Sequence, residues 1–313
     1  MTMNAKVTLL AGGIGGAKLA EAYEKMTTVD LTVVPNVGDD DEFHGLWVSP
    51  DIDTITYTLS DRINTEFGWG VKNDTLNALG TLKELGEEAW MTLGDKDLGL
   101  HIYRTHQIKL GKLKSEITEK VALAFGIRSK IILPTDDILQ TQIKTDRGVL
   151  SFQEYFVKNR CEPNVLDLLF FNSENTRLNP KVISAFETAE LIIIAPSNPL
   201  LSILPILKIN GMREILQKFK EKVCVVSPII DGKAIKGPTI KIMNSMGYES
   251  TSLGIAKFYE SLASKIVCDN SDENLKNDIQ KHIPKVIFTP TLMKTLEDKI
   301  RLAEEIVKGM IQR

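Results

Sequence analysis

Four glycines near the N-terminus, Gly12, Gly13, Gly15 and Gly16, are the first residues with a pattern that suggests chemistry. They follow a short apolar run, KVTLLA, and precede a helix-like segment that begins at Ala17. Glycine lets backbone N–H groups approach an anion closely, and the first turn of a helix adds partial positive charge. The stretch therefore predicts a strand, a glycine loop and a helix that together bind a phosphate.

The glycine stretch matches neither of the common nucleotide motifs. No Lys-Ser or Lys-Thr follows the last glycine, as a P-loop requires, and the glycines are spaced differently from those of the dinucleotide fingerprint. A tight turn that only packs a helix against a sheet is the alternative interpretation.

Aspartates follow the next apolar run, Leu31 to Pro35, and recur in the sequence SPDIDT at residues 49–54. Ligands of an open parallel sheet bind at the carboxyl ends of its strands, and carboxylates suit a magnesium ion that bridges phosphates. Converging carboxylates repel one another unless a cation lies among them. The candidate metal ligands are Asp51, Asp53 and the aspartates at residues 39–41. The alternative is that Asp39 to Glu42 form a solvated turn.

A third charged stretch, LGDKDLGLHIYRT at residues 93–105, contains Lys96, His101 and Arg104. His101 and Arg104 are three positions apart and therefore share one face of a helix, where both could point at the same anion. An exposed helix entry would produce the same charges, so this alternative stays open.

The composition indicates a stable globular protein: 313 residues, 43% of them hydrophobic, with a net charge of −3. Acidic and basic residues are interspersed along the chain, so the sequence indicates no basic surface that would bind nucleic acid or an anionic membrane. No signal-peptide core or long apolar span is evident, and the three separated cysteines, Cys161, Cys224 and Cys268, fit buried thiols in a reducing cytoplasm. We expect a cytoplasmic protein that binds small molecules.

The order of apolar strands and helix-like segments predicts an α/β fold with a doubly wound, mostly parallel, Rossmann-like sheet. We expect a single domain over residues 1–313, with residues 1–58 and 164–313 as the nucleotide-binding core. Residues 59–163 form an inserted helical and β-hairpin subdomain. Its hairpin joins TQIKT to VLSFQEYFV through Asp146-Arg147-Gly148, and LDLLFF at residues 166–171 begins the return to the parallel sheet.

Two later loops should lie at the same sheet edge as the glycines. The first is APSNP, with Ser197, Asn198 and Pro199, and the second includes Ser227 to Ile230 and Lys236-Gly237-Pro238. Such loops offer hydroxyl, amide and backbone N–H groups to a nucleotide. A nicotinamide oxidoreductase is disfavoured, because Pro35-Asn36 stands where an acidic residue would hold the ribose.

Taken together, the motifs resemble the 2-phospho-L-lactate transferase family of coenzyme F-420 biosynthesis, in the same order from Lys6 to about Tyr259. The motifs are GGIGGAKL, NVGDD, SPDIDT, WGVKNDT, LGDKDLGLHIYRT, PTDD, TQIKTDRGVLSFQEYFV, APSNP, VVSPIIDGKAIKGP and Met246-Gly247.

The resemblance implies a magnesium-dependent transferase that takes a guanylyl-activated phospho-acid, lactyl-2-diphospho-5'-guanosine or its enolpyruvoyl analogue. The acceptor is the ribityl hydroxyl of 7,8-didemethyl-8-hydroxy-5-deazariboflavin (Fo), and GMP is released. The family precedent also implies a homodimer. The sequence does not say which phospho-acid, phospholactate, phosphoenolpyruvate or phosphoglycerate, is transferred.

The resemblance also implies roles for single residues. The four glycines, Lys18, Ser197, Asn198 and Pro199 would hold the nucleotide. Asp40, Asp51 and Asp53 would form the catalytic metal cluster, and Asp53, Lys96 and Phe152, or Tyr155, would contact Fo. His101 and Arg104 would bind the diphosphate or the organic carboxylate.

The chain departs from the family pattern at two places. Lys96 stands where the family commonly has arginine. Lysine keeps the positive charge but lacks the forked geometry of a guanidinium. Ile14-Gly15-Gly16-Ala17 stands where the family often has threonine, which removes a hydroxyl. A related group that binds nucleotide sugars and regulates cell-wall metabolism is the alternative function on the same fold.

Overall fold

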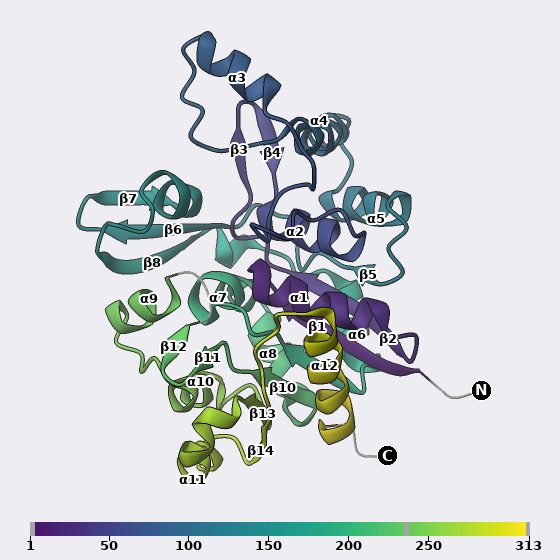
Figure 1. Ribbon diagram of the computed structural model, residues 1–313, viewed down its shortest axis with the longest axis vertical. Helices are drawn as coiled ribbons and strands as arrows, with labels where there is room; N and C mark the ends of the chain where they lie inside the picture. Colours follow the sequence, from purple (N-terminus) through teal and green to yellow (C-terminus); the bar gives the residue numbers. More distant parts are fainter. Residues whose placement is uncertain (1–3, 235–237, 311–313) are drawn as a thin grey trace.

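The computed structural model describes residues 4–234 and 238–310, and its centre is a seven-stranded parallel sheet (Figure 1). The strand order is β14-β13-β10-β9-β1-β2-β5. The strands are β1 (Ala5–Ala11), β2 (Val29–Pro35), β5 (Lys130–Ile131), β9 (Leu191–Ile194), β10 (Val223–Val226), β13 (Lys265–Cys268) and β14 (Lys285–Phe288). Central strands such as β9 are buried along their whole length, because helices cover both faces.

The chain winds outward from β1 in both directions. It first builds β2 and β5 on one side and then returns to build β9, β10, β13 and β14 on the other. The order reverses between β1 and β9, and in such sheets the crevice at the carboxyl ends of these two strands is the usual ligand site. The predicted α/β, doubly wound fold is confirmed.

Two hydrophobic layers hold the helices against the sheet. Leu9 of β1 belongs to the layer that includes α1, α2, α5 and α12, and Leu10 belongs to the layer that includes α6, α8 and α10. The helices are α1 (Gly13–Lys25), α2 (Pro50–Leu59), α3 (Asn77–Glu84), α4 (Asp95–Lys109), α5 (Lys114–Ala124), α6 (Pro180–Thr188), α7 (Leu204–Lys208), α8 (Met212–Lys218), α9 (Thr239–Ser245), α10 (Ser252–Tyr259), α11 (Lys276–Gln280) and α12 (Leu296–Met310).

Residues 41–48, 77–109 and 140–171 form an elaboration beside the parallel sheet, whereas α2, α5 and β5, which lie between them in sequence, belong to the sheet and its helical layer. The hairpin of β3 (Asp41–Phe43) and β4 (Leu46–Val48) stands between α3 and α4, and a separate antiparallel sheet has the order β7-β6-β8 (Figure 1). Its strands are β6 (Gln140–Thr145), β7 (Gly148–Ser151) and β8 (Val165–Phe171). A two-stranded antiparallel pair, β11 (Ile229–Ile230) and β12 (Lys233–Ala234), follows β10 in sequence. No helix in residues 4–234 or 238–310 is long and apolar enough to cross a membrane.

Two sequence-based expectations about these elements are wrong. The run LDLLFF does not join the parallel sheet: it lies in β8, which pairs antiparallel with β6. The hairpin between β6 and β7 is confirmed, but its second strand ends at Ser151, and Glu154–Lys158 forms a π-helical turn, η1, instead of a longer strand. Lys236 and Gly237 lie outside the described residues, so the motif that contains them is only partly visible.

Candidate active site

The glycine turn lies at the carboxyl end of β1, and α1 begins at Gly13, four residues before the predicted helical start at Ala17. The amide of Gly13 donates to Asp51 Oδ1 at 2.7 Å, and the amide of Gly12 donates to Ser197 Oγ at 3.2 Å. Two of the amides expected to face a phosphate are therefore bonded to the protein itself.

Close packing explains why glycine is needed at these positions. A Cβ on residue 12 would stand 2.6 Å from Asp51 Oδ2, and one on residue 16 would stand 2.8 Å from Ser197 Oγ. A Cβ on residue 15 would collide with the carbonyl of Pro196. The glycines bring the N-terminus of α1 against α2 and the loop after β9, so the tight-turn interpretation describes part of their role.

The other predicted nucleotide residues also have structural partners. Ser197 Oγ donates to the Gly12 carbonyl at 2.7 Å, so Ser197 fastens the loop after β9 to the glycine turn. Asn198 accepts from the amides of Leu200 and Leu201 and caps the π-helical turn η3 (Pro199–Ile203), whose first residue is the buried Pro199. Lys18 Nζ donates to the Met293 carbonyl at 2.8 Å.

Buried carboxylates gather where β2, the hairpin and α2 meet. Asn36, the residue after β2, donates through Nδ2 to Asp39 Oδ1 at 2.9 Å and to Asp51 Oδ2 at 3.0 Å. Asp40 accepts from Ser49 Oγ at 2.9 Å through Oδ2, whereas its Oδ1 is buried and has no hydrogen-bond partner. Asp39 and Asp40 are buried, so they are not part of a solvated turn, whereas Glu42, at the end of the same stretch, is exposed.

Burial raises the pKa of three of these carboxyl groups. The pKa of Asp40 rises to about 7, although the charges of Lys114 and Arg104 oppose the rise. The pKa of Asp51 rises to about 6 against hydrogen bonds from Asn36 and Gly13. Burial and then the charge of Asp51 raise the pKa of Asp39. Hydrogen bonds and the charges of Lys114 and Arg104 offset the effect of burial only in part, and a bound cation would stabilise the charged carboxylates further.

Asp53 has a different environment, because it faces α4. Arg104 binds both of its carboxylate oxygens, with Nη1 3.1 Å from Oδ2 and Nη2 in contact with Oδ1. His101 Nδ1 lies 3.7 Å from Asp53 Oδ2. His101 and Arg104 do share one helix face, as predicted, but that face is buried against α2 and is not an exposed helix entry.

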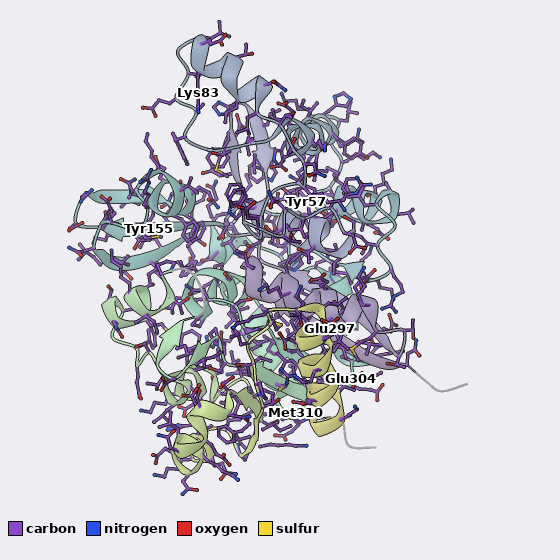
Figure 2. All side chains as sticks on the ribbon, in the orientation of Figure 1. Tyr57, Lys83, Tyr155, Glu297, Glu304 and Met310 are labelled. Atoms are coloured by element: carbon purple, nitrogen blue, oxygen red, sulfur yellow. The ribbon has the colours of Figure 1, made fainter. Side chains whose placement is uncertain are left out.

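The residues predicted to contact Fo are spread around the elaboration. Lys96 is exposed at the start of α4, and its Nζ donates to the backbone carbonyls of Lys72 and Asn73. Phe152 is half-buried and stacks on Phe156 with centroids 5.6 Å apart. Tyr155 is fully buried in the core, so it does not face a ligand (Figure 2).

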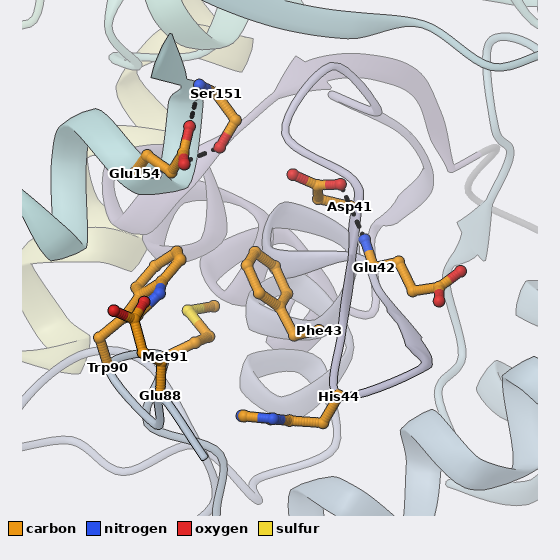
Figure 3. A pocket seen from close by; sticks show the side chains of 9 residues that line it. All are labelled: Asp41, Glu42, Phe43, His44, Glu88, Trp90, Met91, Ser151 and Glu154. Carbon is orange, nitrogen blue, oxygen red and sulfur yellow. Dashed lines mark hydrogen bonds between the residues drawn. The ribbon is translucent and has the colours of Figure 1, made fainter. Parts of the chain in front are cut away.

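A cavity of about 390 Å³ opens beside the hairpin β3–β4. Phe43, Trp90 and Met91 form its apolar side, and Figure 3 shows Ser151 and Glu154 across from them. The remaining lining residues are Asp41, Glu42, His44 and Glu88. Asp41 directly follows the buried Asp40, so the cavity adjoins the carboxylates.

The carboxylates fit a magnesium ion in part. No group of three His, Cys, Asp or Glu side chains in the described ranges is already arranged as a metal site. Magnesium often takes one or two carboxylates and completes its sphere with water and substrate phosphates. The unpartnered Oδ1 of Asp40 meets this need. Asp51 accepts from the uncharged donors of Gly13 and Asn36, whereas Arg104 already occupies Asp53.

Comparison with known proteins assigns the chain to a family. The family profile described as "2-phospho-L-lactate transferase CofD" matches residues 7–301. The chain belongs to the CofD family. A 2-phospho-L-lactate transferase of Methanocaldococcus jannaschii is 40% identical over 308 residues, which cover 96% of this chain and 97% of that protein. The enzyme of the same name from Methanosarcina mazei is 36% identical, with coverage of 96% and 99%.

Among solved structures, a Bacillus halodurans protein of the UPF0052 family has a TM-score of 0.64 to this CofD-family chain. The two are 13% identical, and the match covers 96% of this chain and 99% of the other. At this identity the likeness shows the common fold alone. The CofD family is one of enzymes, and its curated members above are transferases.

Sequence reasoning did not select four polar residues of this candidate site, the buried Asn36, Ser49 and Tyr57 and the half-buried Asp97. Asn36 is the first residue after a strand, a position that often faces a ligand. Tyr57 and Asp97 are each four positions from a residue already singled out, Asp53 and His101, and this spacing could have identified them.

Proposed function

We propose that this protein catalyses a step of coenzyme F-420 biosynthesis. It transfers the phospholactyl or phosphoenolpyruvyl group of a guanylyl-activated donor to the ribityl hydroxyl of Fo and releases GMP. The observation that best supports this proposal is the meeting of buried carboxylates with the N-terminus of α1, where Asp51 accepts from Gly13. Such a place suits a metal-bound diphosphate, and the curated relatives are 2-phospho-L-lactate transferases.

Asp40 and Asp51 would hold the magnesium ion. The ion would neutralise the diphosphate of the donor and so favour departure of GMP. Asp51 would at the same time orient the first turn of α1 through the Gly13 amide. The glycine turn and the loop of Ser197, Asn198 and Pro199 would surround the rest of the donor, at the crevice between β1 and β9.

The cavity beside the hairpin is our candidate for the Fo ring. Its volume of about 390 Å³ and its aromatic side suit a flat tricycle, which Trp90 and Phe43 can contact. Four carboxylates line it, namely Asp41, Glu42, Glu88 and Glu154, and they would repel the anionic donor. The acceptor, which carries no phosphate, and the highly charged donor would therefore bind on opposite sides of the carboxylate cluster.

The reaction forms one bond and breaks one bond at phosphorus. The ribityl oxygen bonds to the phosphorus that bears the organic acid, and the bond from that phosphorus to the oxygen shared with GMP breaks. GMP leaves with that oxygen, and the hydroxyl proton is released to solvent. Asp53 would orient the hydroxyl, and the adjacent Arg104 would balance its charge. Catalysis would rest on positioning and charge neutralisation.

We also propose, on the family resemblance, that the protein is a cytoplasmic homodimer. Light scattering on the purified protein would measure its mass against the 34.9 kDa of one chain.

Incubation with Fo, magnesium and each guanylyl-activated acid tests the proposal. A deazaflavin product whose mass has increased by one phospho-acid supports it and identifies the donor. Tight binding of a nucleotide sugar, with no transfer to Fo from any donor, would favour the regulatory alternative instead.

A further inference from the structure

Five buried or partly buried polar side chains connect α2 to α4 beneath the carboxylate cluster. Asp97, His101 and Arg104 form one stripe on α4, and Asp53 and Tyr57 form the facing stripe on α2. Tyr57 lies within α2, toward the upper part of the molecule (Figure 2). Of these five, Arg104 and His101 were expected to bind a substrate anion, but each faces protein groups instead.

The contacts of Arg104 determine the tautomer of His101. Arg104 Nη1 lies 3.3 Å from His101 Nδ1, and a guanidinium can only donate, so a hydrogen bond between them requires an Nδ1 that carries no proton. The proton of the neutral ring is then on Nε2. That nitrogen lies 3.1 Å from Asp97 Oδ1, within ion-pair distance but off the direction of a straight hydrogen bond.

Tyr57 holds the far end of this chain of contacts. Its hydroxyl donates to the same Asp97 Oδ1 at 2.6 Å. Burial alone would raise the pKa of Asp97, but the contacts with His101 and Tyr57 lower it, so the carboxylate stays charged opposite the ring. The His101 ring is therefore held between a fixed anion and a fixed cation.

The near end of the chain is Asp53. Arg104 Nη1 has three acceptors: Asp53 Oδ2 at 3.1 Å, His101 Nδ1 at 3.3 Å and the Trp47 carbonyl at 3.4 Å. Asp53 Oδ2 also accepts a hydrogen bond from the Ser49 amide, at 3.3 Å. The orientation of Asp53 thus depends on Arg104, and that of Arg104 depends on His101.

We propose that His101 is a positioning residue, which accepts from Arg104 and thereby fixes the guanidinium that orients Asp53 for transfer to Fo. Asp97 and Tyr57 hold the His101 ring in the tautomer that can accept. The inference rests on the proposed transfer reaction, and it replaces the expectation that His101 binds the diphosphate or the carboxylate.

Two substitutions at His101 separate this role from simple packing. In His101→Asn the amide oxygen can take the place of Nδ1 and accept from Arg104. In His101→Gln the amide reaches the place of Nε2 and Asp97, and the acceptor for Arg104 is lost. We expect His101→Asn to keep kcat within about threefold of wild type and His101→Gln to lower kcat by about tenfold or more, with the KM for the donor unchanged in both.

His106, exposed on the same helix, is the matched control, and His106→Asn and His106→Gln should both behave as wild type. Equal losses of kcat in the two His101 variants, or losses only of thermal stability, would overturn the inference, because a structural role does not depend on which nitrogen is replaced.

A second measurement does not depend on turnover. Long-range ¹H–¹⁵N correlation spectra of the labelled protein, assigned with the His101 variants, report which ring nitrogen carries the proton. We expect the proton on Nε2. A proton on Nδ1 would overturn the inference about His101 and leave the proposed function untouched. If wild-type protein transfers no group to Fo from any donor, the proposed function fails, and the inference fails with it.

Discussion

Asp51 of α2 accepts a 2.7 Å hydrogen bond from the amide of Gly13, the first residue of α1, across 38 positions of sequence. This bond joins the carboxylate cluster to the positive end of a helix at the switch point of the sheet. It places a candidate metal ligand beside the crevice where an anion would bind. The following predictions depend on that arrangement.

Gly12→Ala should lower both stability and activity. The added Cβ would lie 2.6 Å from Asp51 Oδ2 and 2.7 Å from Ser202 Cβ, so α1 or α2 must shift. We expect a loss of about 1 to 3 kcal/mol in the free energy of unfolding, measured by urea denaturation. Gly80→Ala is the control, because nothing lies within 4 Å of its Cβ position in α3, and this change should be neutral or stabilising. Equal losses in the two variants would contradict the packing argument.

Asp53→Asn should lower kcat by about a hundredfold or more while leaving the circular dichroism spectrum unchanged. The amide keeps the shape of the carboxylate, but it leaves the buried Arg104 without a charged partner. Asp30→Asn, at an exposed position, is the matched control. Turnover at saturating magnesium close to that of wild type would show that Asp53 is not part of the active site.

Magnesium should stabilise the protein more at about pH 8 than at about pH 5. The pKa values of Asp40 and Asp51, about 7 and about 6, are higher than in an unfolded chain. The folded protein therefore binds more protons than the unfolded chain between about pH 4 and pH 7, and without metal its stability falls as the pH rises through that window. At higher pH the ion meets carboxylates that are already charged.

Thermal unfolding with magnesium and with a chelator, at both pH values, measures this difference. The double variant Asp40→Asn, Asp51→Asn should lose the response to magnesium. A magnesium-induced rise in Tm that is the same at both pH values, or that persists in the double variant, would argue against these two ligands.

Lys96→Ala should raise the KM for Fo, with little change in the KM for the donor. The side chain holds the carbonyls of Lys72 and Asn73 at the start of α4 and supplies positive charge there. We expect an increase of about tenfold, measured from initial rates at varied Fo. Lys83→Ala, in exposed α3, controls for the loss of a surface charge. An unchanged KM for Fo would reject the contact between Lys96 and Fo.

Trp90→Leu should also raise the KM for Fo if the ring occupies the cavity beside the hairpin. The indole lines that cavity and contacts Phe43 edge to face, with centroids 5.5 Å apart. We expect a rise of about tenfold, and Trp90→Phe should recover part of it because an aromatic face remains. A higher KM for the donor, with that for Fo unchanged, would instead place the nucleotide in the cavity.

The sequence predicted the sheet and its ligand edge because their signals are local. Apolar runs followed by Gly12, by Asn36 and by Ser197 mark the carboxyl ends of three neighbouring parallel strands, and the structure places all three together. The fold class follows from the same alternation of strands and helices.

Elements whose position depends on distant partners were harder to predict. LDLLFF is as apolar as a strand of the parallel sheet, and only its antiparallel pairing with β6 separates the two cases. The charges of α4 predicted a shared face correctly, but which way that face points is decided by packing against α2, which no local pattern encodes. The hydrogen bonds of Ser197 and Asn198 could not be predicted either, because they too depend on how the chain packs.

The most direct test of the account measures GMP release and the mass of the deazaflavin product together, with purified protein, magnesium, Fo and each guanylyl-activated acid. The account predicts that one donor gives GMP and Fo carrying the phospho-acid in equal amounts, that neither forms without Fo, and that Asp53→Asn lowers the rate of both by about a hundredfold or more. No product with any donor, or release of GMP without a matching deazaflavin product, would contradict it.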